Sequence, residues 1–118
     1  MYETYRQRLS DPAARGAFTV PRVADYDSLN YHSYFLILNS AADGEGLRRH
    51  LLARGIQAYI GYVPLHSSRM GRRLGYAPDD LPITEEYAHR VLRLPTHTEL
   101  TVDDVNAICS AIIEFFAA

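Results

Sequence analysis

The chain has 118 residues, 47% of them apolar, which fits one globular domain with a single core and excludes a disordered tail. A formal net charge of −2, from 12 basic and 14 acidic residues, gives no electrostatic basis for binding nucleic acid or an anionic membrane. All the basic residues are arginine, so the chain has no lysine amine for Schiff-base catalysis.

The first part of the chain predicts a helix and then a long connection. Three apolar side chains share one face of a helix over residues 1–9, namely Tyr2, Tyr5 and Leu9. Residues 10–30 hold prolines, a glycine and several aspartates, which predict a loop or extended segment. The first residues lack the apolar core of a signal peptide, and no stretch reaches the roughly 20 apolar residues of a membrane span. We therefore expect a cytoplasmic protein.

The middle of the chain predicts two strands with a helix between them. Residues 31–38 are rich in aromatic and branched apolar side chains and predict the first strand. Asp43 is expected to cap a helix that ends near Gly55, a residue suited to the position after a helix. The second strand is expected over residues 56–62, and Pro64 ends it because proline cannot donate to a strand ladder.

The next segment predicts short elements. Residues 66–75 predict a short helix that ends at Gly75, and residues 76–82 predict a loop. Thr84 is expected to cap a helix that runs to about Arg90. A third short strand is then expected over residues 91–94, stopped by the proline that follows.

The last helix is the strongest helical pattern in the sequence. Thr101 opens it, with Asp104 placed for a capping box. One apolar face is expected to be buried: Val105, Ile108, Cys109, Ile112, Ile113 and Phe116. A lone cysteine on that face predicts a buried, inert thiol and excludes an internal disulfide. The whole order predicts an α/β (α+β) sandwich over residues 1–118, a single domain with a small sheet of about three strands flanked by helices.

Few residues are candidates for chemistry. No two of the five histidines have metal-ligand spacing, so no metal site is expected, and there is no nucleophile elbow, Walker loop or dinucleotide fingerprint. His66 follows a strand end, where α/β proteins place sites. His32, beside Asn30, is either a site residue or a core histidine bonded to the backbone. An arginine cluster forms either a phosphate site or a solvated helix face: Arg69, Arg72 and Arg73.

Several short motifs stand in the same order, and at nearly the same spacing, as in one enzyme family. They are YETY at residues 2–5, AFTVP at 17–21, NYHSYF at 30–35, YVPLHS at 62–67 followed by Gly71 and Gly75, and RVLRLP at 90–95. Together they cover essentially the whole chain. They resemble the C-terminal small domain of the DegT/DnrJ/EryC1/StrS family of pyridoxal phosphate (PLP)-dependent sugar-nucleotide aminotransferases, above all those that form dTDP-4-amino-4,6-dideoxygalactose.

The resemblance implies a part of a larger enzyme. Residues 1–30 correspond to a lead-in helix and loop and residues 31–118 to the small domain of a fold-type I aminotransferase. In such enzymes a larger N-terminal domain holds PLP and its lysine. That domain is the partner implied for this chain, which is expected to hold no cofactor and no catalytic residue and to be inactive alone. The complete enzymes transfer an amino group from glutamate to a dTDP-4-keto-6-deoxy sugar for cell-surface polysaccharide synthesis, and they act as dimers.

The resemblance also implies substrate-binding residues. His66 and Tyr62 correspond to residues that line the sugar-nucleotide side of the cleft, and Asn30 and His32 to residues near its floor. The segment Ser67-Ser68-Arg69 departs from the Ser-Cys-Pro of the family. Two other functions stay open: a non-catalytic binding or assembly module that keeps this fold, and an unrelated small enzyme that uses His66 as a general base.

Overall fold

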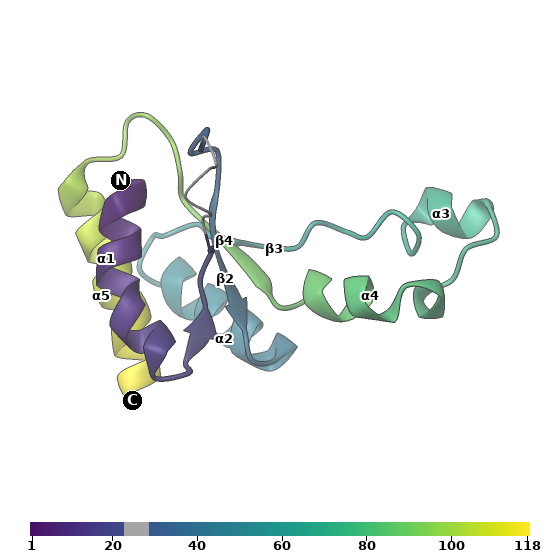
Figure 1. Ribbon diagram of the computed structural model, residues 1–118, viewed down its shortest axis with the longest axis horizontal. Helices are drawn as coiled ribbons and strands as arrows, with labels where there is room; N and C mark the ends of the chain where they lie inside the picture. Colours follow the sequence, from purple (N-terminus) through teal and green to yellow (C-terminus); the bar gives the residue numbers. More distant parts are fainter. Residues whose placement is uncertain (23–28) are drawn as a thin grey trace.

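The computed structural model describes residues 1–22 and 29–118, which form a body of one sheet and three long helices with an arm projecting from it (Figure 1). The longest dimension is 47 Å. In chain order the elements are α1 (Tyr2–Ala14), β1 (Phe18–Thr19), β2 (Tyr34–Leu38), α2 (Ala41–Leu52), β3 (Tyr59–Ile60), α3 (Arg69–Arg73), a 3₁₀ turn (Pro78–Asp80), α4 (Pro82–Ala88), β4 (Val91–Leu94) and α5 (Val102–Ala117).

The four strands form one antiparallel sheet in the order β1-β2-β4-β3. Its centre is the β2–β4 pair, where Leu36 lies opposite Leu92 and both side chains are fully buried. Alternate residues of β2 point to opposite faces, so Tyr34 is buried while Phe35 is only half-buried. The predicted fold class, a small sheet flanked by helices, is confirmed, and β1 adds a fourth short strand at the edge.

Three helices, α1, α2 and α5, cover one face of the sheet, and α1 lies beside α5 (Figure 1). The fully buried side chains between helices and sheet include Tyr5, Leu9, Leu47, Leu51, Val105 and Ile112. The predicted start of α5 is confirmed, because the Thr101 hydroxyl accepts a hydrogen bond from the Asp104 amide at 3.1 Å and the Asp104 carboxylate accepts one from the Thr101 amide. Among the described residues, no helix of the body lies on the other face of the sheet (Figure 1).

The first helix is longer than predicted. It continues past Leu9 to Ala14, and Pro12 lies inside it. The proline removes one backbone donor, but the amides that follow still reach helix carbonyls, as Arg15 N–H does to the Asp11 oxygen at 3.1 Å. The predicted loop over residues 10–30 is also wrong at Phe18–Thr19, which pairs with β2 as β1. Residues 23–28 of that predicted loop lie outside the described residues.

Two strands are shorter than predicted. β2 begins at Tyr34 because Tyr31 has a φ of 53°, in the left-handed region, which ends the extended backbone before it. β3 spans only Tyr59–Ile60, because the Ile56 amide still bonds to the Leu51 carbonyl in the turn that ends α2. In that turn Gly55 has a φ of 75°, as its predicted place after the helix requires.

Two predicted helix caps are wrong by a few residues. Ser40 caps α2, and its hydroxyl accepts a hydrogen bond from the Asp43 amide at 3.0 Å, so Asp43 is the third residue of the helix. The helix predicted from Thr84 begins at Pro82, because proline suits a first helical turn, whose amides have no partner within the helix. The short helix before Gly75 and the strand Val91–Leu94 are confirmed.

Cys109 lies fully buried in α5, as predicted, and burial raises the pKa of its thiol to about 11. The thiol is therefore protonated and unreactive near neutral pH. Within residues 1–22 and 29–118, no helix combines the length and the apolar character needed to cross a bilayer.

Candidate functional site

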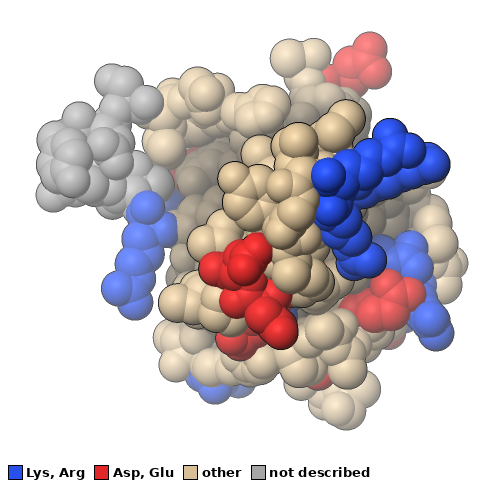
Figure 2. Space-filling view, turned by 90° about the vertical axis from the view of Figure 1, so that its right-hand side faces the viewer, with Lys and Arg blue, Asp and Glu red and all other residues tan. Residues whose placement is uncertain are grey.

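Residues 61–90, here called the arm, leave the sheet after β3, carry α3 and α4, and return to the sheet at β4 (Figure 1). Of the 13 large hydrophobic residues that are exposed in the described parts of the chain, nine lie on the arm: Tyr62, Val63, Leu65, Met70, Leu74, Tyr76, Leu81, Ile83 and Tyr87. Figure 2 shows uncharged surface between separate acidic and basic groups on the face toward which the arm points. An exposed apolar surface of this extent is typical of a contact with other protein.

Close backbone packing fixes the tip of the arm. Gly71 in α3 is buried against the preceding turn, where a side-chain carbon would lie 2.2 Å from the carbonyl oxygen of Leu65 and 2.3 Å from that of His66. Ser68 caps α3, and its hydroxyl accepts from the Gly71 amide and donates to the Leu65 carbonyl at 2.7 Å. Only glycine allows this approach.

His66 joins two segments of the arm: the one that leaves the sheet before α3, and the one that returns to it through the 3₁₀ turn and α4. Its side chain is buried, and its Nε2 lies 3.2 Å from the carbonyl oxygen of Pro78, to which it donates a hydrogen bond. The same nitrogen lies 3.1 Å from Glu85 Oε2. That oxygen is buried and makes no hydrogen bond to any described residue. We therefore assign His66 a structural contact in the arm, where it also lines a hollow of about 850 Å³ at the tip.

A hollow of about 920 Å³, here called the main cavity, lies between the end of β4, the segment before β2, and α5. Tyr62 and His32, two of the residues that the sequence singles out, both line it. His66 does not. Asn30 lines a smaller hollow of about 230 Å³ beside it, together with His32. The Asn30 side chain accepts a hydrogen bond from the His32 amide at 3.1 Å, so Asn30 fixes the backbone that carries His32.

His32 is not a core residue. Its side chain is exposed, and its carbonyl accepts a hydrogen bond from the Thr96 hydroxyl at 3.1 Å, which joins the segment before β2 to the segment after β4. The interpretation of His32 as a buried histidine bonded to the backbone is therefore wrong, because the strand begins only two residues later and the ring falls outside the sheet.

Arg93 also lines the main cavity, although no motif or predicted site residue in the sequence includes it as a site residue. It lies on the open face of β4, opposite Phe35 on one side and Tyr59 on the other. Its guanidinium stacks over the Tyr62 ring, 3.9 Å from the ring centre. The sequence holds one signal for it. Arg93 is the polar residue of the otherwise apolar strand VLRL, and side chains alternate between the two faces of a strand, so Arg93 lies on the face opposite the buried Leu92 and Leu94.

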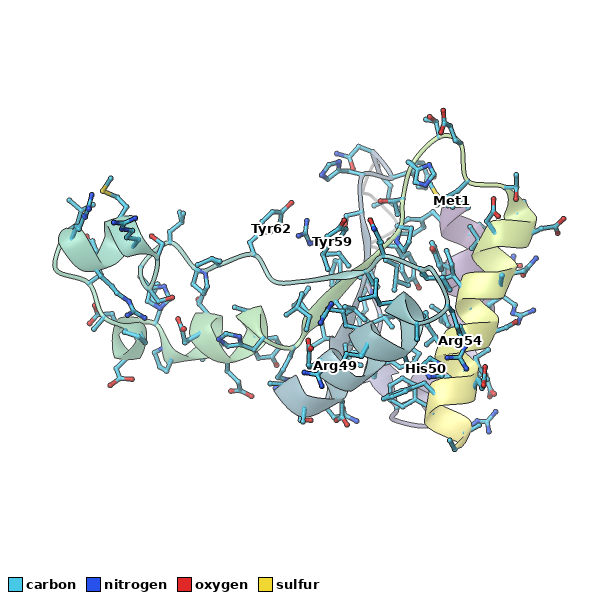
Figure 3. The ribbon with its side chains drawn as sticks, turned by 180° about the vertical axis from the view of Figure 1, so that it is seen from behind. Met1, Arg49, His50, Arg54, Tyr59 and Tyr62 are labelled. Carbon is cyan, nitrogen blue, oxygen red and sulfur yellow. The ribbon has the colours of Figure 1, made fainter. Side chains whose placement is uncertain are left out.

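Tyr59 and Tyr62 project from the segment where the arm leaves the sheet, whereas Arg54 lies beside α5 (Figure 3). The Tyr59 hydroxyl donates a hydrogen bond to the Gln57 side chain at 3.1 Å. Asp104 also lines the main cavity, and hydrogen bonds from Thr101 lower the pKa of its carboxyl. Asp104 is therefore ionised near neutral pH and committed to the cap of α5.

The residues of the chain do not by themselves fit PLP. Covalent attachment of PLP requires a lysine amine, and the sequence contains none. Among the residues that the structure describes, no three His, Cys, Asp or Glu side chains are grouped to hold a metal ion. The chain therefore offers surfaces and a cavity, and any covalent chemistry of PLP has to come from other residues.

Known proteins resemble the chain over nearly all of its length. Residues 1–113 match the model of the DegT/DnrJ/EryC1/StrS aminotransferase family. A pleiotropic regulatory protein of Geobacillus stearothermophilus is 28% identical over 110 residues, which are 92% of this chain and 29% of that protein.

Solved structures of aminotransferases also match nearly the whole chain. A family aminotransferase from Brucella abortus superposes with a TM-score of 0.79 at 28% identity, covering 99% of this chain and 30% of that one. S. venezuelae DesV, in complex with a ketimine intermediate, superposes at 0.81 with 25% identity, covering 96% and 30%. Helicobacter pylori PseC, at 24% identity and a TM-score of 0.83, shows the shared fold. The chain spans about a third of the length of these relatives, and it belongs to the DegT/DnrJ/EryC1/StrS aminotransferase family.

Proposed function

We propose that the chain acts as the small domain of a sugar-nucleotide aminotransferase and that its arm packs against a PLP-binding portion of such an enzyme. The proposal rests on the arm, because nine large hydrophobic side chains are exposed on it. Burying an exposed side chain of this size contributes about 1.5–3 kcal/mol, so a partner surface that covers the arm binds strongly. The match to the Brucella abortus structure covers 99% of this chain, so it includes the arm and supports this arrangement.

In the proposed enzyme the main cavity forms one wall of the substrate cleft. Tyr62 and His32 contact the sugar nucleotide there, and Asn30 supports His32 through its backbone. His66 contributes to the same cleft indirectly, because its contacts with Pro78 and Glu85 fix the segment of the arm that carries Tyr62. PLP, bound by the other portion, supplies the chemistry that carries the amino group. The donor is glutamate and the acceptor a dTDP-4-keto-6-deoxy sugar, and the enzyme is a dimer.

The same surfaces also fit a second function, a binding or assembly module that keeps the fold. The exposed arm and the main cavity can bind other molecules without turnover, and neither needs a lysine. Such a module binds a partner subunit or a nucleotide sugar without turnover. The two functions differ in what happens when a PLP-binding portion is supplied.

The test is a chimaera in which the chain replaces the matching segment of the Brucella abortus aminotransferase, 28% identical to it. A covalent link keeps the two portions at high effective concentration. With ¹⁵N-glutamate and dTDP-4-keto-6-deoxyglucose, we expect mass spectrometry to find ¹⁵N in an amino sugar nucleotide. The same protein without any small domain is expected to give none, because one wall of the cleft is missing.

A chimaera that folds and binds PLP but transfers no amino group to any keto-sugar nucleotide would count for the binding module and against the aminotransferase. The isolated chain serves as a second control. Treated with PLP and borohydride, it is expected to carry no adduct on an internal side chain, because it has no lysine. An internal adduct found by peptide mapping would contradict the proposal that PLP is bound by another portion of the enzyme and not by this chain.

A further inference from the structure

Every other arginine of the chain either contacts a carboxylate or is exposed, and among the described residues Arg93 does neither. Six of them contact a carboxylate within 4 Å: Arg6, Arg15, Arg48, Arg49, Arg54 and Arg90. Arg93 has no carboxylate partner among the described residues, although it is half-buried. Its Nε is fully buried and makes no hydrogen bond to any described residue. Burying part of a guanidinium without an anion costs free energy, so the position is suited to receive one.

The walls around Arg93 favour a negative ligand with a flat or apolar part. The main cavity is lined by two imidazoles, His32 and His97, and by Arg54, whose charge is balanced by Glu114 at 2.8 Å. The acidic side chain in its lining, Asp104, is held by the cap of α5 through Thr101. This leaves Arg93 as the fixed positive charge that no carboxylate of the described residues balances.

The Tyr62 ring sets the direction in which Arg93 can bind. The guanidinium carbon lies 3.9 Å from the centre of the Tyr62 ring, so the ring covers one side of the guanidinium and holds it in the wall of the main cavity. A planar guanidinium presents paired donors that match two oxygens of a phosphate. Tyr59 and Tyr62, exposed on the same side of the arm's base, offer flat apolar faces next to those donors (Figure 3).

We propose that Arg93, held by Tyr62, is the anion-binding residue of the main cavity and that it takes the diphosphate of a nucleoside diphosphate. A cavity of about 920 Å³ is large enough for a nucleotide. The guanidinium donates to the diphosphate oxygens, and the imidazoles of His32 and His97 stand nearby as further donors. The site as an anion site stands on geometry alone; the identification of the anion as the diphosphate of the substrate rests on the proposed function.

The test follows the Arg93 Nε–H signal by ¹⁵N NMR while the full chain is titrated with four probes: pyrophosphate, dTDP, thymidine and glutamate. We expect the signal to shift in a saturable way with pyrophosphate and dTDP, and not with thymidine or glutamate. The Nε–H of Arg49, an exposed arginine of α2 whose Nε lies 2.7 Å from a Glu45 carboxylate oxygen, is the control and is expected to stay in place. Because this titration uses the unaltered chain, it needs no variant to fold.

Variants add a second measurement. Arg93→Ala is expected to weaken dTDP binding by about tenfold or more, the effect of losing a charged hydrogen bond, and Arg49→Ala to leave it unchanged. Arg93→Lys is expected to recover part of it, because it keeps the charge but not the paired donors. An unmoved Arg93 signal, equal binding by Arg93→Ala, or an equal response to glutamate overturns the proposal. A chimaera inactive in transamination that still binds dTDP through Arg93 leaves the proposal standing and refutes the proposed function alone.

Discussion

Replacing Gly71 with alanine is expected to prevent the tip of the arm from forming while the body of the protein stays folded. The new carbon would lie 2.2 Å and 2.3 Å from two backbone oxygens, those of Leu65 and His66, and neither is a flexible side chain that can move aside. Overpacking of this kind costs about 1–3 kcal/mol. The tip lies far from α1, α2 and α5, so the loss stays local (Figure 1).

In the chimaera, Gly71→Ala is expected to lower the rate of amino transfer on the order of a hundredfold, because a small displacement of a substrate-positioning wall has effects of that size. The measurement compares transfer rates, with the melting temperature as a check on the body. Arg73→Ala, on the same helix but exposed, is the matched control and is expected to keep the rate. Equal rates for Gly71→Ala and Arg73→Ala contradict the role given to the arm.

Leu36→Ala is expected to lower the free energy of unfolding of the isolated chain by about 2–5 kcal/mol. Leu36 is fully buried at the centre of the sheet, opposite Leu92, beneath the three helices of the body. The substitution removes buried apolar surface and leaves a cavity that packed neighbours fill only in part.

Urea unfolding followed by circular dichroism measures this effect. Leu52→Ala is the control, because Leu52 lies at the end of α2 with half of its surface exposed, and we expect its cost to be much smaller. Comparable decreases in the free energy of unfolding for Leu36→Ala and Leu52→Ala would show that the centre of the sheet is not the core of the body.

Periodicity in the sequence predicted most of the body. The apolar face of α5 and the apolar runs of β2 and β4 appear in the sequence because each element packs against one neighbour with a regular repeat. Strand β1 escaped prediction because two residues are too short for a repeat, and pairing with β2 forms it. The prolines of residues 10–30 predict a loop directly after Leu9, but packing of α1 against α5 carries the helix past Pro12 to Ala14.

The site was predicted less well than the fold. Tyr62 and His32 were singled out through a family resemblance and do line one cavity, although 29 residues separate them in the chain. Arg93 was not singled out, because its importance comes from stacking on Tyr62, a contact that no local pattern records. The position of His66 after a strand predicts a site residue, but the arm folds back on itself and places the His66 ring against Pro78 and Glu85 of the returning segment.

The central claim, that the arm packs against a PLP-binding portion, is tested most directly by amide hydrogen exchange of residues 61–90 in the isolated chain and in the chimaera. Peptides of the arm that include Val63, Leu65 and Ile83 are expected to exchange more slowly in the chimaera, because protein covers their exposed side chains there. Peptides of α1 and α5 are expected to change little. Equal exchange of the arm in the two proteins, with the chimaera folded and holding PLP, would contradict the account.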